Sequence, residues 1–257
     1  MSVEAALAGP LFDPLRTWLA QLPARPDGEA LAHLLANHPV LLADGRPLRF
    51  VPPKDDGLAY ECRVWESGEV ETRPDHWHDY FNALVWLSFP ETKRAVTAAH
   101  VAAMQAQGEA RGRVRDALTH FDECGIVVLS TRVDLLDLLR NFQWKSLFVD
   151  HRAEVRACMR FVVFGHATYE LLLKPFRGLT AKAVLYEVGT DCLTLAGDAL
   201  NAAVDCRLAE DLSSGRYTRP RDFQPLPLLG IPGVTAASED AAYYDDVWQF
   251  RPGRRAQ

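Results

Sequence analysis

Two pairs of polar residues lie one helical turn apart within segments that are otherwise apolar. His78 and Asn82 form the first pair, with Asp79 between them, and His166 and Glu170 form the second. Because residues at i and i+4 share one face of an α-helix, the members of each pair project together. Histidine and carboxylate side chains bind Zn²⁺, Mn²⁺ and Fe²⁺, and they also act as general acids and bases. Each pair is therefore a candidate for metal binding or catalysis.

The first pair supports two interpretations. His78 can be a metal ligand or a general base that Asp79 or Asn82 orients, as a second polar partner commonly orients such histidines. In the structural alternative, Asp79 favours the dipole at the start of its helix, while His78 and Asn82 hold the adjoining segment by hydrogen bonds. The residue types leave both interpretations open.

The second pair follows directly after an apolar strand, predicted at 160–164, and Gly165. A helix that begins at the carboxyl end of a strand presents free N–H groups, and small-molecule and anion sites are common there. A divalent metal held by the two helices would take His78, His166 and Glu170 as ligands. The structural alternative is that His166 caps its helix while Glu170 pairs with an arginine.

A third group of charged residues surrounds a predicted helix-to-turn junction: Arg113, Arg115, Asp116, Asp122 and Glu123. Paired carboxylates can bind a divalent metal or divide the roles of acid and base, although such a junction is also typical of ion pairing. The predicted catalytic residues are His78, Asp79, Asn82, Asp116 and Glu123.

The two helical pairs are expected to meet at one polar cavity, although they are far apart in the sequence. Leaving a buried polar group without a partner costs about 1–3 kcal/mol. Convergence of His78 and Asn82 with His166 and Glu170 would provide partners for both pairs.

The apolar periodicity predicts an α+β fold in which helix exceeds strand. Strands at 60–65 and 69–73 are predicted to form a β-hairpin around 66–68, and this hairpin joins a small mixed sheet with strands at 126–129 and 160–164. Residues 181–188 are ambiguous. Asp191 is the predicted N-cap of the last helix, and Gly108 the predicted end of another. The predicted helices are 12–22, 28–37, 75–89, 90–107, 111–121, 133–148, 166–174 and 192–212.

One domain is expected. Residues 1–50 form a helical arm that packs on the body, and residues 51–257 form the main domain. The prolines and glycines of 225–233 argue against regular structure, yet this segment is too apolar for a solvated linker. We expect it to lie on the body as an extended, buried strap.

Several short motifs occur in the order of an uncharacterised bacterial family. They are Thr72-Arg73, Trp77-His78-Asp79, residues 81–86, Phe89-Pro90, Arg113, residues 115–119, residues 121–123, Gly125, residues 164–166 with Glu170, residues 225–233 and Phe250-Arg251. The chain thus resembles the domain-of-unknown-function family 3025 over roughly its last four-fifths. It departs from that family's pattern at His76 and Val234. The resemblance implies no known activity.

The composition limits the classes of function. The 257 residues include 28 Lys+Arg and 34 Asp+Glu, which gives a net charge of −6. This charge disfavours nucleic-acid processing, which only Arg111, Arg113, Arg115 and the basic residues of 251–255 would suggest. No segment approaches the roughly 20 apolar residues of a membrane span, and Glu4 is atypical of a signal peptide. We predict a cytoplasmic protein whose five widely spaced cysteines are free thiols.

Two functional hypotheses remain. The leading one is a small-molecule hydrolase or related enzyme that uses a divalent metal, with the polar groups described above as ligands or acid and base. The alternative is a non-catalytic binding or interaction protein in which the same groups form a buried structural network. No GxSxG, Walker A, GxGxxG or HExxH motif is present to decide between them.

Overall fold

The computed structural model describes residues 2–107 and 112–253. The predicted helix end at Gly108, the predicted helix start at Arg111 and the basic residues Arg254 and Arg255 therefore lie outside the described residues. Within them, helix clearly exceeds strand, as the periodicity predicted, and the fold is α+β. The α-helices are α1 (Val3–Leu7), α2 (Arg16–Leu19), α3 (Gly28–Asn37), α4 (Tyr60–Ser67), α5 (Trp77–Ser88), α6 (Pro90–Gln107), α7 (Arg113–Cys124), α8 (Val133–Arg140), α9 (Arg152–Cys158), α10 (His166–Leu173), α11 (Thr190–Thr194) and α12 (Gly197–Ser213).

The strands form two separate sheets. The larger has the order β4-β3-β5-β6 and is mixed, since β3 pairs antiparallel with β4 and parallel with β5, while β6 pairs antiparallel with β5. The smaller consists of β1 and β2, paired in parallel. The strands are β1 (Arg49–Val51), β2 (Glu69–Glu71), β3 (Gly125–Ser130), β4 (Met159–Val163), β5 (Thr180–Glu187) and β6 (Gln224–Pro227).

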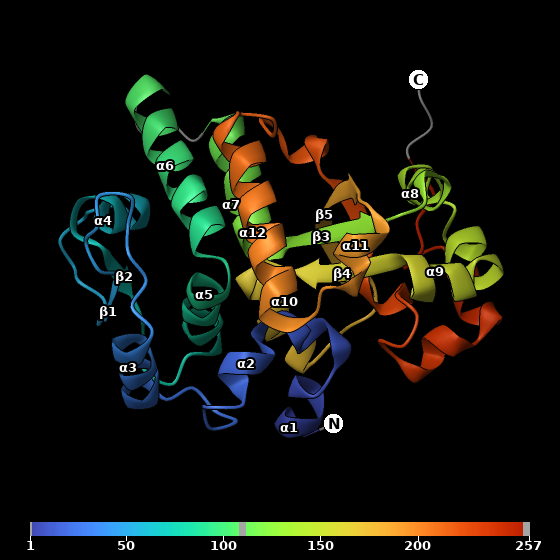
Figure 1. Ribbon diagram of the computed structural model, residues 1–257, viewed down its shortest axis with the longest axis horizontal. Coiled ribbons are helices and arrows are strands. Elements are labelled where there is room, and N and C mark those ends of the chain that lie inside the picture. The colour runs from blue at the N-terminus through green and yellow to red at the C-terminus, as the bar shows by residue number, and fades with distance from the viewer. Residues whose placement is uncertain (1, 108–111, 254–257) are drawn as a thin grey trace.

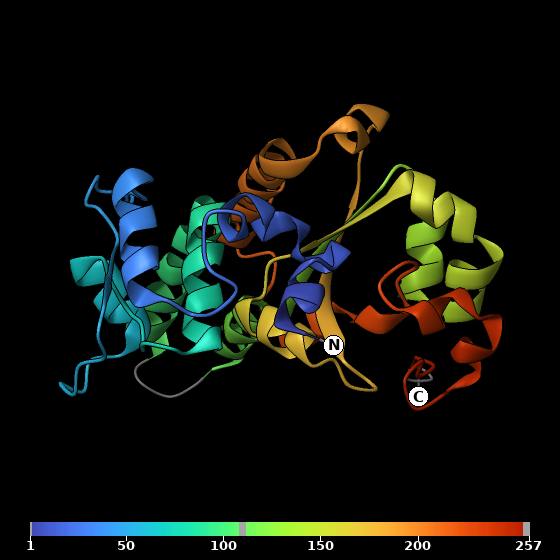
Figure 2. The same ribbon diagram turned by 90° about the horizontal axis from the view of Figure 1, so that it is seen from below.

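The elements are arranged along one long axis (Figures 1 and 2). Helices α3 to α6 and the small sheet lie at one end, and α8, α9 and the C-terminal turns lie at the other, with the larger sheet between them. Every residue of β3 is buried. The carboxyl end of α7 leads directly into β3, and the carboxyl end of β4 leads through Phe164 and Gly165 into α10. These two connections lie beside each other because β3 and β4 are antiparallel neighbours.

The predicted β-hairpin is wrong. Residues 60–67 form helix α4, which ends at Gly68 in the left-handed conformation with φ 69°. The alternation of Tyr60 to Trp65 also contains a helical i, i+4 pair, in which Tyr60 is partly buried and Val64 fully buried, while Trp65 is 46% exposed. Gly68 therefore terminates a helix instead of making a hairpin turn. The β2 strand that follows pairs in the small sheet and does not join the larger one.

Two long predicted helices are interrupted. In place of the helix predicted at 133–148, α8 ends at Arg140. Phe142, two residues later, has a positive φ of 57°, and the π-helix η2 (Ser146–Asp150) follows. The helix predicted at 192–212 is split into α11 and α12 before Gly197, so Asp191 lies inside α11 and is not its N-cap. Helix α2 is likewise short, because η1 (Pro10–Leu15), a 3₁₀-helix, precedes it and contains Pro14. The ambiguous segment 181–188 lies almost entirely in strand β5, which spans Thr180–Glu187.

The Pro-rich segment is buried, as predicted, but it does contain regular structure. Leu226 and Leu228 are fully buried and Ile231 is 4% exposed. The segment includes strand β6 and the 3₁₀-helix η4 (Leu228–Gly230). Proline is tolerated in β6 because this strand is at the edge of the sheet, where a missing N–H group leaves no ladder bond unmade. Three further 3₁₀-helices are η3 (Pro220–Asp222), η5 (Ala236–Glu239) and η6 (Ala241–Asp245).

The N-terminal segment packs on the helices that carry the site. The Phe12 ring lies 5.9 Å from that of Phe81 in α5 and 5.4 Å from that of Tyr169 in α10. Trp18 donates a hydrogen bond of 2.9 Å to Ser88 at the end of α5. The division of the chain at residue 50 into an arm and a main domain stays a prediction.

Two smaller sequence predictions concern membranes and thiols. None of the helices in the described ranges has the length and the apolar character that crossing a membrane requires. Cys62, Cys124, Cys158, Cys192 and Cys206 are all free in the structure, as predicted.

Asp205 of α12 holds the start of α6. Its two carboxylate oxygens accept hydrogen bonds from the backbone N–H groups of Glu91, at 3.0 Å, and Thr92, at 2.7 Å. Asp205 is 3% exposed, so water does not substitute for these bonds. The first turn of a helix has N–H groups without helical partners, and a carboxylate there satisfies them.

We expect Asp205→Ala to lower the free energy of unfolding by about 1–3 kcal/mol, because the buried N–H group of Thr92 and the partly buried one of Glu91 lose their acceptor. Chemical denaturation followed by circular dichroism measures this change. The matched control is Glu210→Ala, since Glu210 is exposed on the same helix, and this substitution should have little effect. Equal losses for both variants would contradict the role of Asp205.

Candidate metal centre

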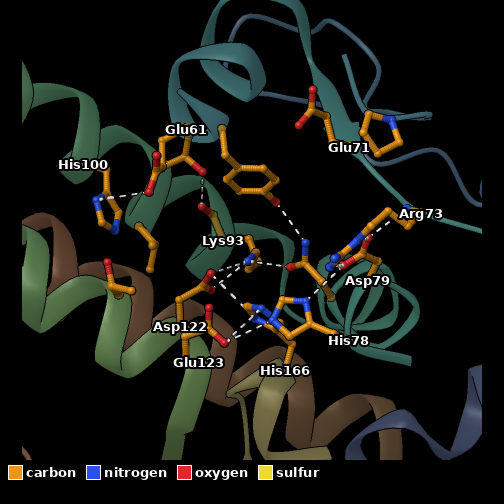
Figure 3. Close-up of a pocket in the computed structure, with 16 residues that line it drawn as sticks. Glu61, Glu71, Arg73, His78, Asp79, Lys93, His100, Asp122, Glu123 and His166 are labelled. Carbon is orange, nitrogen blue, oxygen red and sulfur yellow. Dashed lines mark hydrogen bonds and ion pairs between the residues drawn. The ribbon is translucent and has the colours of Figure 1, made fainter. Parts of the chain in front are cut away.

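Three side chains from different helices meet at one point of the structure (Figure 3). His78 lies in the first turn of α5, Glu123 in the last turn of α7, and His166 is the first residue of α10. The Oε2 atom of Glu123 lies 3.3 Å from Nε2 of His78 and 3.5 Å from Nε2 of His166. The ligand atoms of all three residues lie within 4.8 Å of one another. The predicted convergence of the two histidines is therefore observed.

The backbone at Gly165 brings α10 against the end of α7. The N–H groups of Phe164 and Gly165 both donate to the carbonyl oxygen of Gly125, at 3.0 and 2.8 Å. A Cβ atom on Gly165 would lie 2.3 Å from the nitrogen of Gly125 and 2.5 Å from the carbonyl oxygen of Glu123. Only glycine permits this approach, and it places His166 beside Glu123.

We expect Gly165→Ala to separate α10 from α7 and thereby to move His166 away from Glu123. The overlap involves backbone atoms, which have no rotamer to change, so the free energy of unfolding should fall by about 1–3 kcal/mol. Denaturation measures this loss. The control is Gly28→Ala, because a Cβ atom there has no neighbour within 4 Å. A Gly165→Ala protein as stable as the wild type would contradict the close approach.

Asp79 orients the imidazole of His78. Its carboxylate accepts three hydrogen bonds of 2.8 Å from Arg73, one from the backbone nitrogen and two from the guanidinium group. The Nδ1 atom of His78 lies 3.1 Å from Oδ1 of the same carboxylate. Burial opposes the charge of Asp79, but the hydrogen bonds from Arg73 and His78 outweigh it and hold the pKa of Asp79 well below its usual range. The carboxylate is thus ionised and directs Nε2 of His78 toward Glu123.

Asp122 has the corresponding position behind His166. Its Oδ2 atom lies 3.8 Å from Nδ1 of His166, which has no hydrogen-bond partner in the described part of the chain. His166 is 3% exposed, and burial lowers its pKa to about 4. The ring is therefore neutral near pH 7 and keeps a lone pair for a ligand. At His78, by contrast, the hydrogen bond with Glu123 raises the pKa despite partial burial.

Lys93 is the buried cation of the site. It is 2% exposed, and its Nζ atom donates to both oxygens of Asp122, at 2.7 and 2.9 Å, and to Oδ1 of Asn82, at 2.9 Å. Burial disfavours the charge, but the attraction of Asp122 prevails and raises the pKa of Lys93. Burial likewise opposes the Asp122 carboxylate, whose pKa Lys93 nevertheless lowers. The two residues form a charged pair.

The separations of Glu123 from His78 and from His166 fit the ligand spacing of a tetrahedral metal ion. Zinc binds nitrogen and oxygen at about 2.0–2.2 Å, so two of its ligand atoms lie about 3.3–3.6 Å apart. The separations of 3.3 and 3.5 Å at Glu123 have this length. The 3.3 Å hydrogen bond of His78 with Glu123 is longer than the distance of about 2.7–2.9 Å that is typical between a charged donor and a carboxylate. The hydrogen bond between Nδ1 of His78 and Asp79 is also typical of a metal-binding histidine, whereas Asp122 lies 3.8 Å from Nδ1 of His166 and makes no such bond.

A second group of metal-ligating types includes His76, His78 and Asp79. The Nδ1 atom of His76 lies 3.6 Å from Oδ1 of Asp79. However, the Asp79 carboxylate already accepts three hydrogen bonds from Arg73. This group is therefore the poorer candidate for metal binding, and the better set of ligands is His78 with Glu123 and His166.

The cluster forms part of the wall of a cavity of about 400 Å³. The lining residues come from α4 to α7, α10, the small sheet and the segments that follow its two strands, and most of them are polar (Figure 3). They are Pro53, Tyr60, Glu61, Glu71, Arg73, His78, Asp79, Asn82, Lys93, Val96, Thr97, His100, Thr119, Asp122, Glu123 and His166.

Two of the predicted site residues do not line this cavity. Asp116 lies two helical turns from Glu123 along α7, and Glu170 lies one turn from His166 along α10. The spacing in the sequence selected Glu170 as the carboxylate partner of His166, because those two share a helix face. In the structure that carboxylate is Glu123 from another helix, which only the contact of α7 with α10 could reveal.

Other residues of the site escaped the sequence analysis. Val96 and His100 are buried, and they follow Lys93 by three and by seven residues, so all three share the buried face of α6. A lysine on an apolar helix face was the available signal that a carboxylate must lie opposite. Arg73 had no comparable signal, because its partner Asp79 is identified only by the bend of the chain before α5.

A family model described as "Protein of unknown function (DUF3025)" matches residues 48–254, which include all the residues of the cavity. No curated protein and no solved structure matches the chain.

Proposed function

The chain belongs to the DUF3025 family of proteins of unknown function, and we propose that it is a hydrolase of small molecules that depends on a divalent metal. One observation carries the proposal. His78, Glu123 and His166 converge at the wall of a cavity, Glu123 lies at the spacing of a metal's ligands from both histidines, and the Asp79 carboxylate lies within hydrogen-bond distance behind His78.

This donor set suits hydrolysis. Three protein ligands would leave a fourth position of a tetrahedral ion open to water, and such an ion would lower the pKa of that water to about 7. A cavity of about 400 Å³ has the volume of a small-molecule site. Two nitrogen ligands and one oxygen ligand would accept Zn²⁺, Mn²⁺ or Fe²⁺. The substrate of this proposal is a small molecule and not a nucleic acid, because a net charge of −6 disfavours nucleic-acid binding. A cytoplasmic location stays a prediction.

Metal content distinguishes this proposal from a purely structural polar network. We expect the wild type to bind about one Zn²⁺ per chain after dialysis, measured by inductively coupled plasma mass spectrometry. Glu123→Gln and His166→Ala should lose the metal, because two remaining ligands do not form a stable site. Metal-dependent hydrolysis of a panel of small esters, amides and phosphoesters should disappear with it.

The matched controls are Glu170→Gln and Asp116→Asn, which remove carboxylates on the same two helices outside the cavity. Both should retain the metal. If the wild type binds no metal and the cluster variants change only the melting temperature, the structural alternative holds and the hydrolase proposal fails.

Asp79→Asn tests the carboxylate behind His78. This substitution keeps the size of the side chain but removes the charge that orients the imidazole, so the dissociation constant for Zn²⁺ should rise about 10- to 100-fold. Competition with a chromophoric chelator measures it. Asp134→Asn, which affects an exposed ion pair on α8, is the control and should leave the constant unchanged. An unchanged constant in Asp79→Asn would contradict the orienting role.

A further inference from the structure

The hydroxyl oxygen of Tyr60 is surrounded by hydrogen-bond donors. Tyr60 is the first residue of α4 and lines the cavity. Its oxygen lies 3.0 Å from Nδ2 of Asn82 and 3.4 Å from Nε1 of Trp86. The indole N–H of tryptophan can only donate, so this bond has one possible direction.

The direction of the Asn82 bond is fixed by Lys93. The lysine ammonium group has three N–H donors and no lone pair, so the side-chain atom of Asn82 that faces it at 2.9 Å must be the carbonyl oxygen. The NH₂ group of Asn82 then faces Tyr60 and donates to it. Lys93 is itself held by both oxygens of Asp122. The donors of Lys93 therefore determine the orientation of the Asn82 amide, although its oxygen and nitrogen ends have nearly the same shape.

The hydroxyl hydrogen of Tyr60 is left for the cavity. A phenol oxygen accepts through its lone pairs and donates one hydrogen, and here Asn82 and Trp86 both act as donors to it. No hydrogen bond from Tyr60 reaches an acceptor within residues 2–107 and 112–253. Burial raises the pKa of Tyr60, so the hydroxyl keeps its proton near neutral pH. The side chain is a donor without an acceptor at the wall of the cavity.

We propose that Tyr60 donates this hydrogen bond to the carbonyl oxygen of an acyl substrate, an amide or ester, bound at the metal centre. The inference rests on the proposed hydrolase function and deepens it by naming the substrate class. Such a donor strengthens its bond as negative charge develops on the carbonyl oxygen. Water adds its oxygen to the acyl carbon, the bond to nitrogen or alkoxy oxygen breaks, and the leaving group takes a proton from that water.

The charges of the cavity favour a carbonyl oxygen over a phosphate dianion. Arg73 and Lys93 are neutralised by Asp79 and Asp122. Two further carboxylates line the cavity: Glu71, whose Oε1 lies 3.0 Å from Nε of Arg63, and Glu61, which lies 3.6 Å from Nδ1 of His100. Among the lining residues that the structure describes, each lysine and arginine has a carboxylate partner, so only the metal would attract a phosphate dianion, whereas a neutral acyl group needs no such charge.

The probe for this site is acetohydroxamate, a carbonyl compound that binds metal ions. Its dissociation constant is measured from the visible spectrum of the Co²⁺-loaded protein. We expect Tyr60→Phe to weaken acetohydroxamate about tenfold, the effect of losing one hydrogen bond to a polar or charged oxygen, with one Co²⁺ per chain retained. Tyr80→Phe is the control, because the Tyr80 hydroxyl bonds the carbonyl oxygen of Pro23 outside the cavity. Inorganic phosphate should bind more weakly than acetohydroxamate.

Asn82→Asp tests the direction of the hydroxyl. An aspartate carboxylate only accepts, so it would take the hydrogen of Tyr60 and remove it from the cavity. The added negative charge also weakens the binding of anions, and a double-mutant cycle separates the two effects. Tyr60→Phe should raise the dissociation constant for acetohydroxamate about tenfold in the wild-type background and less than about twofold in the Asn82→Asp background.

The outcomes are distinguishable. Absence of bound metal in the wild type overturns the hydrolase proposal and this inference together. If the metal is retained, equal acetohydroxamate affinities of wild type and Tyr60→Phe overturn the inference alone, as does an absence of acetohydroxamate binding. A tenfold loss in both backgrounds contradicts the deduced direction of the hydroxyl, and tighter binding of phosphate than of acetohydroxamate contradicts the acyl class.

Discussion

The buried ammonium group of Lys93 is the constraint on which the arrangement of the site depends. An unpaired charge at this position would cost several kcal/mol, so a carboxylate has to accompany it. Asp122 supplies that carboxylate from α7, and Asn82 supplies a further acceptor from α5. These bonds hold α5, α6 and α7 in fixed positions relative to one another. The same pair determines which way the Asn82 amide points, and it places a carboxylate behind the imidazole of His166.

The polar groups of the cavity fall into two kinds. Those around Lys93 and Arg73 have short hydrogen bonds of 2.7–2.9 Å and are mutually satisfied. The atoms of the histidine and glutamate cluster are 3.3–3.5 Å apart, and the Tyr60 hydroxyl has donors around it but no protein acceptor among the described residues. A satisfied network that surrounds longer contacts and an available hydroxyl donor is the arrangement of a preorganised binding site, in which the supporting residues fix those that contact the ligand.

Much of the fold was predictable because helix and strand signals are local. The bounds of the helix Gly28–Asn37 and the start of α6 at Pro90 agree with the capping and proline signals, and the strands at 126–129 and 160–164 agree with their apolar runs. The prediction failed at residues 60–73, where alternation and helical spacing coexist within eight residues. A helical C-cap and a hairpin turn both use glycine, so Gly68 could not decide between them.

The sequence by itself determined which side chains had to find partners: His78, Asp79 and Asn82 on an apolar helix, and His166 after a buried strand. It could not identify those partners, since spacing along one helix describes neighbours on that helix only. The tertiary structure decided that Glu123, and not Glu170, joins the two histidines. The physical reason is the backbone contact at Gly165, which brings the start of α10 against the end of α7 and has no trace in the periodicity of either helix.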